Sequence, residues 1–293
     1  MRKTSIILML GLGVCACGKE IEGPAPVVVG VSPPAVCQAQ VSTTVALTGQ
    51  GLSPLYTGAL DKGKLELPAV SLGRVMDVAG APVAMSTSIA IPDDPNTPAQ
   101  SYVRWTSQTA MSFDVFPGLL LPTGLYDIHV ANANGKTGTF PASLLAVPPP
   151  TVTRIEADLA CNGKDNSFTL TGDFFIRTAT TMPSVKAGDL VLAPVAMTAC
   201  RNLPGTGGFQ ACTQMTIAVP KAALAPGVVL VQVTNPGPVG CSSIEQVSLT
   251  LVPEPVVTSF VPDLGCAAEG AVLVKVQGTG FLTVDGAAPT VTV

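Results

Sequence analysis

The sequence is poor in charge and in the side chains that most active sites use. Only 12% of its 293 residues are charged, and it contains one histidine and one tryptophan. Globular proteins usually have about 25% charged residues. Lys and Arg nowhere gather into a basic stripe, so the phosphate contacts that give nucleic-acid affinity are missing. We therefore exclude nucleic acid as a partner.

Glycine, proline and small apolar residues are abundant instead. The chain has 29 Gly and 27 Pro, and 47% of it is hydrophobic. This mixture favours short strands joined by many turns and disfavours long helices. The apolar residues recur at strand spacing and the net charge is only −4, which argues against disorder. The length allows two or three domains of about 100–150 residues each.

The N-terminus predicts export. Arg2 and Lys3 precede an apolar run over residues 6–14. This run is too short to cross a bilayer, which takes about 20 apolar residues.

The segment that follows, Val14-Cys15-Ala16-Cys17, resembles the lipobox of bacterial lipoproteins, in which a small residue precedes the lipidated cysteine. The resemblance implies a signal peptide over residues 1–16 and a lipidated tether over residues 17–25, with the lipid on Cys17. Cys15 fits the pattern less well, because Val14 precedes it. Three acyl chains would hold the protein permanently, since two already anchor a protein stably.

The same resemblance suggests a location. In Gram-negative lipoproteins, an Asp close after the lipidated cysteine commonly retains the protein in the inner membrane, and here Lys19 stands two residues after Cys17. We therefore expect a cell-envelope protein of the outer membrane, with the membrane as its partner through the N-terminal lipid. An ordinary secretory peptide cut elsewhere is the alternative.

Three stretches of the chain repeat one another, over residues 26–52, 150–175 and 255–281. Each begins with Pro, has a Cys eleven residues later, and continues with an alternating apolar strand that ends at Gly. Such repetition indicates tandem copies of one unit. The matching residues are Pro26/Cys37/Gly49, Pro150/Cys161/Gly172 and Pro255/Cys266/Gly278, and the predicted inward pairs are Val45/Leu47, Phe168/Leu170 and Val274/Val276.

The first two repeats also match further downstream. Gly124 and Asn132 correspond to Gly227 and Asn235, each at an offset of 103 residues. The first repeat carries a longer loop between Gly49 and Pro68. When Pro117 is aligned with Pro220, the alternation of Met111/Phe113/Val115 is out of phase with that of Met215/Ile217/Val219, which predicts a bulge or a local shift.

The third repeat ends at Val293, before the later strands that the other two contain. Two sheets cannot close over a core without those strands, and natural proteins avoid the exposed sheet edge that would remain. We therefore expect residues 253–293 to be a partial repeat of a longer array.

The combined pattern resembles the IPT/TIG family. It consists of spaced apolar residues, a strand, Gly and an aromatic residue, then Pro–x–Val–x–x–Gly, and finally Pro-Gly followed by Val–x–Asn. The resemblance covers nearly all of the mature chain and implies an immunoglobulin-like sandwich of about seven strands. We therefore predict an all-β chain of tandem immunoglobulin-like β-sandwiches, with repeat 1 over residues 26–147, repeat 2 over 148–252 and a truncated third over 253–293. The proline-rich joints predict a semi-rigid array.

The single histidine is the first candidate for catalysis. Period-two alternation places Tyr126, Ile128 and Val130 inward, with Asp127 and His129 side by side on the outer face. Repeat 2 has Gln232 at the position of His129, and the sequence has no Gly-x-Ser-x-Gly motif. We predict that the protein is not an enzyme.

No motif indicates a cofactor or a metal. Gly135-Lys136-Thr137 imitates the end of a phosphate-binding loop, but Val130 stands where the first glycine is required, so a hairpin turn is expected. Asp93-Asp94-Pro95-Asn96 lacks the alternating spacing of a calcium loop, and no Cys-x-x-Cys pair suggests zinc.

Six cysteines remain after the signal peptide and Cys17, and export favours their oxidation. Cys200 and Cys212 flank a Gly-rich turn between two strands and are predicted to pair. In a sandwich, Cys161 and Cys241 belong to opposite ends of repeat 2, more than about 20 Å apart, whereas bridged Cα atoms lie within about 7 Å. Opposite ends of neighbouring domains meet in a tandem array, which predicts a Cys37–Cys241 bridge between repeats.

By the same reasoning Cys161 would pair with a later cysteine of the third repeat. An intradomain Cys161–Cys241 bridge is the alternative, and the partner of Cys266 stays open.

Two function classes remain. The first is a structural or adhesive surface array that presents its loops to an unknown protein or cell-wall partner. The second is a carbohydrate-binding or accessory region of a longer glycan-active surface protein. Sugar platforms need exposed aromatic residues, and we expect Trp105, the only tryptophan, to lie in the core or to pack over a domain edge. DNA binding, as in eukaryotic transcription factors of similar fold, is excluded by compartment and charge.

Overall fold

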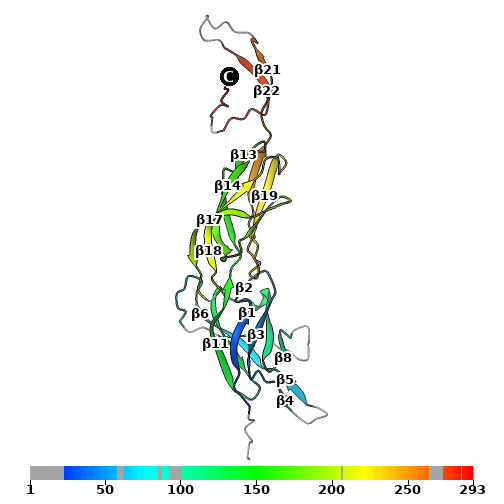
Figure 1. The fold of residues 1–293 in the computed structure, drawn as a ribbon, viewed down its shortest axis with the longest axis vertical. Coiled ribbons are helices and arrows are strands. Elements are labelled where there is room, and N and C mark those ends of the chain that lie inside the picture. The colour runs from blue at the N-terminus through cyan, green and yellow to red at the C-terminus, as the bar shows by residue number, and fades with distance from the viewer. Residues whose placement is uncertain are drawn as a thin grey trace, which may run out of the picture.

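The computed structural model describes residues 23–57, 63–84, 88–92, 101–205, 207–263, 273–284 and 286–292. These residues form two β-sandwiches and a two-stranded ribbon, which follow one another along the long axis of the molecule (Figure 1). The fold is therefore all-β, with tandem immunoglobulin-like sandwiches, as predicted.

Repeat 1 contains a four-stranded and a five-stranded sheet. In immunoglobulin lettering their orders are A-B-E-D and A′-G-F-C-C′, and all pairs are antiparallel except β2 with β11. A separate hairpin, β4 with β5, fills the longer loop. The elements are β1 (Val27–Ser32), β2 (Ala35–Cys37), β3 (Thr43–Gln50), β4 (Leu55–Thr57), β5 (Lys64–Glu66), β6 (Ala69–Met76), β7 (Ile89–Ala90), β8 (Val103–Ser107), β9 (Ala110–Val115), the 3-10 turn η2 (Pro117–Leu119), β10 (Gly124–Ala131) and β11 (Thr137–Val147).

Repeat 2 has the same two sheets in the same order. The two sheets of each repeat contain nine described strands, two more than the expected seven, because the first strand crosses to the second sheet as A′ and a short C′ strand follows C. The strands are β12 (Thr151–Glu156), β13 (Leu159–Cys161), β14 (Asn166–Arg177), β15 (Ser184–Ala187), β16 (Leu190–Leu192), β17 (Pro194–Asn202), β18 (Gln210–Val219), β19 (Gly227–Thr234) and β20 (Val247–Val252).

The ribbon consists of β21 (Val256–Val261) and β22 (Lys275–Thr279), which correspond to strands A and B of the complete repeats. Gly278 lies one residue before the end of β22, as Gly49 does in β3, whereas β14 continues past Gly172 to Arg177, so the predicted strand end at this glycine is wrong for repeat 2. At all three, a Cβ atom would lie about 2 Å from a carbonyl oxygen of strand A, so only glycine fits. All three repeats therefore begin with the same backbone packing.

The inward pairs of repeats 1 and 2 are confirmed. Val45, Leu47, Phe168 and Leu170 are almost completely buried in two separate cores. On the ribbon, Val274 is 46% exposed, since no second sheet covers it among the described residues. Alternation predicts which face a residue takes, and burial then depends on what covers that face.

The phase difference between strands β9 and β18 has a simple cause. Phe113 and Ile217 are both buried and occupy equivalent places, opposite Val45 and Phe168. The connection from β9 to β10 contains η2 and is one residue longer than that from β18 to β19. The predicted shift therefore lies in this loop, since β9 alternates throughout and β18 alternates over residues 215–219.

Besides its strand order, repeat 1 has another feature of immunoglobulin domains, at Tyr126. Its hydroxyl donates to the Pro122 carbonyl at 2.5 Å, which is the contact called a tyrosine corner. Burial raises the pKa of Tyr126 to about 12.

Candidate functional site

The contact between repeats 1 and 2 has an apolar core of its own. This interdomain core contains residues of both repeats, each 7% exposed or less. Interfaces between domains of one chain are usually more polar than this, and relative motion is then the default expectation. The residues are Ala35, Cys37, Leu125, Leu145 and Val147 of repeat 1, and Ile176, Leu203, Phe209, Ala211, Val239 and Cys241 of repeat 2.

Repeat 1 contributes the end of its A′ and G strands. Ala35 pairs in parallel with Leu145, and Cys37 pairs with Val147, so these side chains share one face. Val36 and Ala146, the residues between, face the core of repeat 1 instead. Both faces of this strand pair are therefore buried, which requires an unbroken apolar run.

Asp127 shapes the same end of repeat 1. Its carboxylate accepts the backbone N–H of Ala142 at 2.7 Å, and Ala142 has a positive φ of 46°. The register between β10 and β11 shifts between Tyr126 and Ile128. The carboxylate therefore stabilises a strained bend just before the interdomain face of β11.

Repeat 2 contributes a bulge, a hairpin end and a loop. In the bulge of β14, Phe174 has a φ of 54°. Asn235 holds this bulge, since its side chain accepts the Ile176 N–H at 2.8 Å and donates to the Phe174 carbonyl at 3.0 Å. Asn132 makes equivalent contacts in repeat 1, with Ser53 and Gly51. The repeated asparagine thus fixes the segment just after the shared glycine of strand B, which is a loop in repeat 1 and the bulge of β14 in repeat 2. In repeat 2 this segment faces repeat 1.

A disulfide closes the interdomain core. Cys37 and Cys241 are bonded, with Cα atoms 5.5 Å apart and a sequence separation of 204. The predicted bridge between repeats is present, and the intradomain Cys161–Cys241 alternative is wrong. Cys161 has a free thiol.

The second predicted bridge, Cys200–Cys212, is also present. The two cysteines are directly opposite each other on β17 and β18, with Cα atoms 3.9 Å apart. This disulfide fastens strand D to strand E inside repeat 2.

Polar contacts surround the interdomain core. The Gln40 side chain accepts the Ser242 N–H at 2.8 Å, and Arg201 donates to the Val78 carbonyl at 2.8 Å. The Arg201 guanidinium also lies over the Phe174 ring, 5.1 Å from its centre. An apolar centre with a polar rim is the anatomy of a stable interface.

His129 and Asp127 lie on the outer face, and Tyr126, Ile128 and Val130 point inward, as predicted. The His129 ring hydrogen-bonds to Thr139 at 2.9 Å, whereas Asp127 bonds to Ala142. The two therefore serve separate neighbours on β11.

The other candidate motifs also have structural roles or lie outside the described residues. Residues 132–136 form the expected hairpin turn, in which Asn132 N–H donates to the Lys136 carbonyl at 2.9 Å. Trp105 is half-buried and donates its indole N–H to the Leu52 carbonyl at 2.7 Å, so it packs at a domain edge. Cys17, Cys266 and the stretch 93–96 lie outside the described residues.

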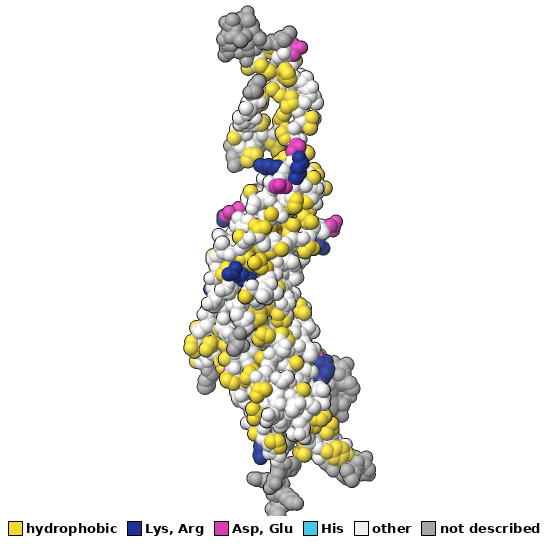
Figure 2. Space-filling view, in the orientation of Figure 1, with side chains coloured by type: hydrophobic (Ala, Val, Ile, Leu, Met, Phe, Trp, Pro, Cys, Tyr) yellow, Lys and Arg dark blue, Asp and Glu magenta, His cyan; other side chains and the backbone are white. Residues whose placement is uncertain are grey.

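Within the described ranges, no three His, Cys, Asp or Glu side chains gather as a metal site would require. The same ranges contain no apolar helix of membrane-spanning length. Charged side chains are few and scattered over the visible face (Figure 2).

Alternation alone did not identify Leu125, Phe209 or Val239 as interdomain residues. Alternation with the inward Tyr126 places Leu125 on the outer face of its sheet, yet it is 2% exposed because repeat 2 covers it. The available signal was the unbroken apolar run Leu144-Leu145-Ala146-Val147, which does not alternate.

No family model and no curated protein matches this chain. Among solved structures, the extracellular region of plexin A4 aligns with 91% of this chain and 18% of its own, at 13% identity and a TM-score of 0.33. A second plexin A4 structure aligns over 88% and 28%, at 10% identity and a TM-score of 0.27. Murine CEACAM1b aligns over 78% and 100%, at 15% identity and a TM-score of 0.25. This chain thus spans less than a third of the plexin chains.

Proposed function

We propose that this chain is a non-enzymatic lipoprotein of the bacterial cell envelope whose IPT/TIG-type repeats form a stiff stalk. One observation carries the proposal: repeats 1 and 2 share a buried apolar core and a disulfide, Cys37–Cys241. A covalent, desolvated joint resists bending far better than a proline-rich linker alone. Stiffness is useful to a protein that must present a surface at a distance from its anchor.

The direction of the chain supports this role. Lys136 Nζ donates to the Gly23 carbonyl at 2.6 Å, so the tether enters repeat 1 beside the turn that precedes β11. The other end of β11, at Val147, belongs to the interdomain core. Gly23, where the described chain begins, and repeat 2 therefore lie at opposite ends of repeat 1 (Figure 1). This arrangement supports a stalk that extends away from a lipid on Cys17.

The anchor is tested by expressing the chain in a Gram-negative host and following its partition into detergent and its labelling with fatty acid. We expect the wild type and Cys15→Ser to be lipidated and to sediment with the outer membrane, and Cys17→Ser to remain unlabelled. Lipid on the Cys17→Ser variant would refute this part of the proposal.

The stalk is tested by small-angle X-ray scattering of the unlipidated Cys17→Ser chain. We expect its curve to fit one extended conformer. Adding Cys37→Ser and Leu125→Asp should require a broad distribution of interdomain angles, whereas adding Cys200→Ser and Cys212→Ser should not. A broad distribution in the parent chain would contradict the proposal.

A further inference from the structure

At the end of repeat 2 that is remote from repeat 1, the A′ and G strands form a face equivalent to the one with which repeat 1 contacts repeat 2. The register is identical, since Cys161 pairs in parallel with Val252 as Cys37 pairs with Val147. Four of the five interdomain positions of repeat 1 are apolar or cysteine in repeat 2, and the fifth is Thr250. The four correspondences are Ala35 to Leu159, Cys37 to Cys161, Leu125 to Val228 and Val147 to Val252.

These equivalent residues differ sharply in exposure. Leu125 is 2% exposed, whereas Val228, its counterpart, is 69% exposed. Leu159 is 38% exposed, whereas Ala35 is fully buried. The remainder of this outer face is mixed, with polar residues such as Lys186 and Gln232 and two exposed apolar residues, Leu230 and Val191. What distinguishes the far end is its position-by-position correspondence to the covered face of repeat 1. Hydrophobic side chains exposed at one end of a sheet indicate a covered surface.

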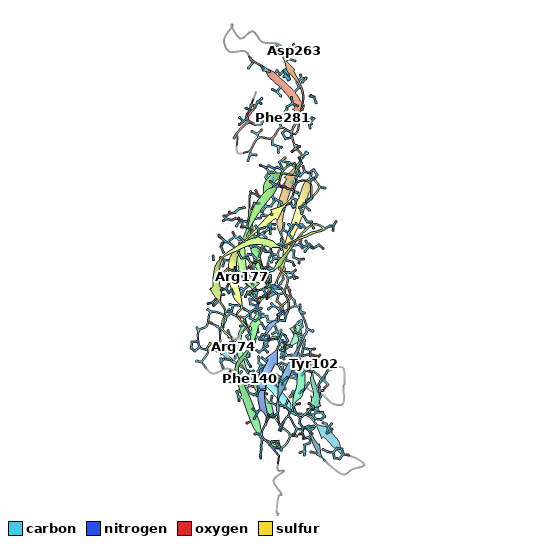
Figure 3. The ribbon with its side chains drawn as sticks, in the orientation of Figure 1. Arg74, Tyr102, Phe140, Arg177, Asp263 and Phe281 are labelled. Carbon is cyan, nitrogen blue, oxygen red and sulfur yellow. A yellow bond between two sulfur atoms is a disulfide. The ribbon has the colours of Figure 1, made fainter. Side chains whose placement is uncertain are left out.

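The ribbon already contacts part of this surface. Counted from the shared glycine, Phe281 and Leu282 correspond to Phe175 and Ile176, and Ile176 belongs to the interdomain core. Phe281 and Leu282 line a cavity of about 200 Å³ together with Cys161 and Val252. Figure 3 shows Phe281 on the side of the ribbon nearer repeat 2. The contact between the ribbon and repeat 2 therefore uses Leu282, at the position that Ile176 holds in the contact between repeats 1 and 2.

The other face of the ribbon lacks a cover within the described residues. Val257, Phe260 and Val274 line a second cavity, of about 560 Å³, and each is about half exposed. Their counterparts Val152 and Ile155 in repeat 2 are buried under the F and G strands. The strand pair, its bulge and its glycine repeat those of the complete sandwiches, so the cover that fits is a second sheet of the same kind.

We infer that the far end of repeat 2 is a docking surface for a complete third immunoglobulin-like repeat that β21 and β22 begin. Cys161 then forms a disulfide with the counterpart of Cys241 in that repeat. The two thiols lose two protons and two electrons to a disulfide oxidant of the envelope, which is reduced to its dithiol by thiol–disulfide exchange. The inference extends the proposed stalk by one joint and does not depend on the lipid anchor.

The test completes the third repeat with the protein's own sequence. Residues 188–252 are appended after Val293, because Pro289 and Val291 correspond to Pro183 and Val185. Non-reducing peptide mapping should then find Cys161 linked to the appended copy of Cys241. Val228→Asp should reduce the yield of this bridge at least several-fold, whereas Val191→Asp, an equally exposed residue of the same sheet, should not.

The appended copies of Cys200 and Cys212 report whether the new repeat folds. If they pair and Cys161 still alkylates without reduction, the inference is overturned. If they do not pair, a variant of the original chain decides: Leu282→Cys should form a disulfide with Cys161 on mild oxidation, and Thr283→Cys, which is outside the cavity, should not. Failure of Leu282→Cys to cross-link would overturn the docking surface. Loss of lipidation alone would leave both results unchanged.

Discussion

Repeats 1 and 2 have the same strand order but fasten their D and E strands differently. In repeat 1, the Arg104 guanidinium on β8 makes two hydrogen bonds to the Asp114 carboxylate on β9, at 2.8 and 2.6 Å. In repeat 2, the corresponding strands β17 and β18 are joined by Cys200–Cys212. One fold thus accepts an exposed ion pair or a covalent bond at the same strand pair, and the two differ greatly in strength.

The same contrast applies to the F strand. Tyr126 forms the tyrosine corner in repeat 1, whereas Val229 stands at its position in repeat 2. Repeat 1 therefore relies on polar contacts where repeat 2 relies on a disulfide and apolar packing. The Cys37–Cys241 bridge couples the stability of the two repeats.

The largest effect is expected from Cys37→Ser with Cys241→Ser. A bridge that closes a loop of 204 residues restricts the unfolded chain by about 5 kcal/mol in the chain-entropy model. Denaturant unfolding of the wild type should be one transition, and that of the variant should separate into two, one for each repeat. Coincident transitions in the variant would show that the apolar core alone couples the repeats.

The next effect is expected from Cys200→Ser with Cys212→Ser. The closed loop is short, with a sequence separation of 12, so the expected loss is about 3 kcal/mol. In the Cys37→Ser and Cys241→Ser background, in which the repeats unfold separately, only repeat 2 should lose stability, as hydrogen exchange of β18 against β9 would measure. Equal loss in both repeats would mean that the D–E bridge stabilises the joint as well.

These two bridges illustrate how much of the molecule was predictable from the sequence. Cysteine spacing and sandwich topology were sufficient to pair Cys37 with Cys241, because strand length separates the ends of a domain. The inward pairs of strand B followed from alternation. The repeated Asn132 and Asn235 were recognised as a pair, but their hydrogen bonds to the segment just after the shared glycine of strand B were not.

Burial between domains was not predictable in the same way. Leu125 and Val228 occupy the same place in the same strand, yet one is covered and the other exposed. No local pattern distinguishes them, because the difference lies in the neighbouring repeat. The roles of Asp127 and Arg104 also depend on which strands become adjacent.

Tyr126→Phe should destabilise repeat 1 by about 1 kcal/mol, since it removes the hydrogen bond that the buried Tyr126 donates to the Pro122 carbonyl. The effect should also depend on pH. The unfolded tyrosine loses its proton near pH 10, whereas the pKa in the folded protein is about 12. The unfolded state therefore binds fewer protons between these values, and wild-type stability falls as pH rises from 10 to 12.

The measurement is denaturant unfolding of repeat 1 at several alkaline pH values, in the Cys37→Ser and Cys241→Ser background in which repeat 1 unfolds separately. The Tyr126→Phe variant should show a weaker decline than the wild type, and Tyr102→Phe serves as the control for loss of an ordinary tyrosine. Parallel declines in the wild type and in Tyr126→Phe would contradict the assignment.

The smallest effect is expected from Arg104→Met, which removes the D–E ion pair of repeat 1. Arg104 is about half exposed, and exposed ion pairs contribute less than about 1 kcal/mol. The hydrogen bonds from Arg104 lower the pKa of Asp114, so the contribution is present at neutral pH and is lost as pH falls from about 4 through that lowered pKa. The wild type should therefore exceed Arg104→Met in stability at pH 7 but not in strong acid.

Arg154→Met, which removes the exposed Arg154–Glu156 pair of repeat 2, is the matched control and should leave repeat 1 unchanged. A stability difference for Arg104→Met that persists at low pH would show that the side chain stabilises repeat 1 by packing across β8 and not by its charge.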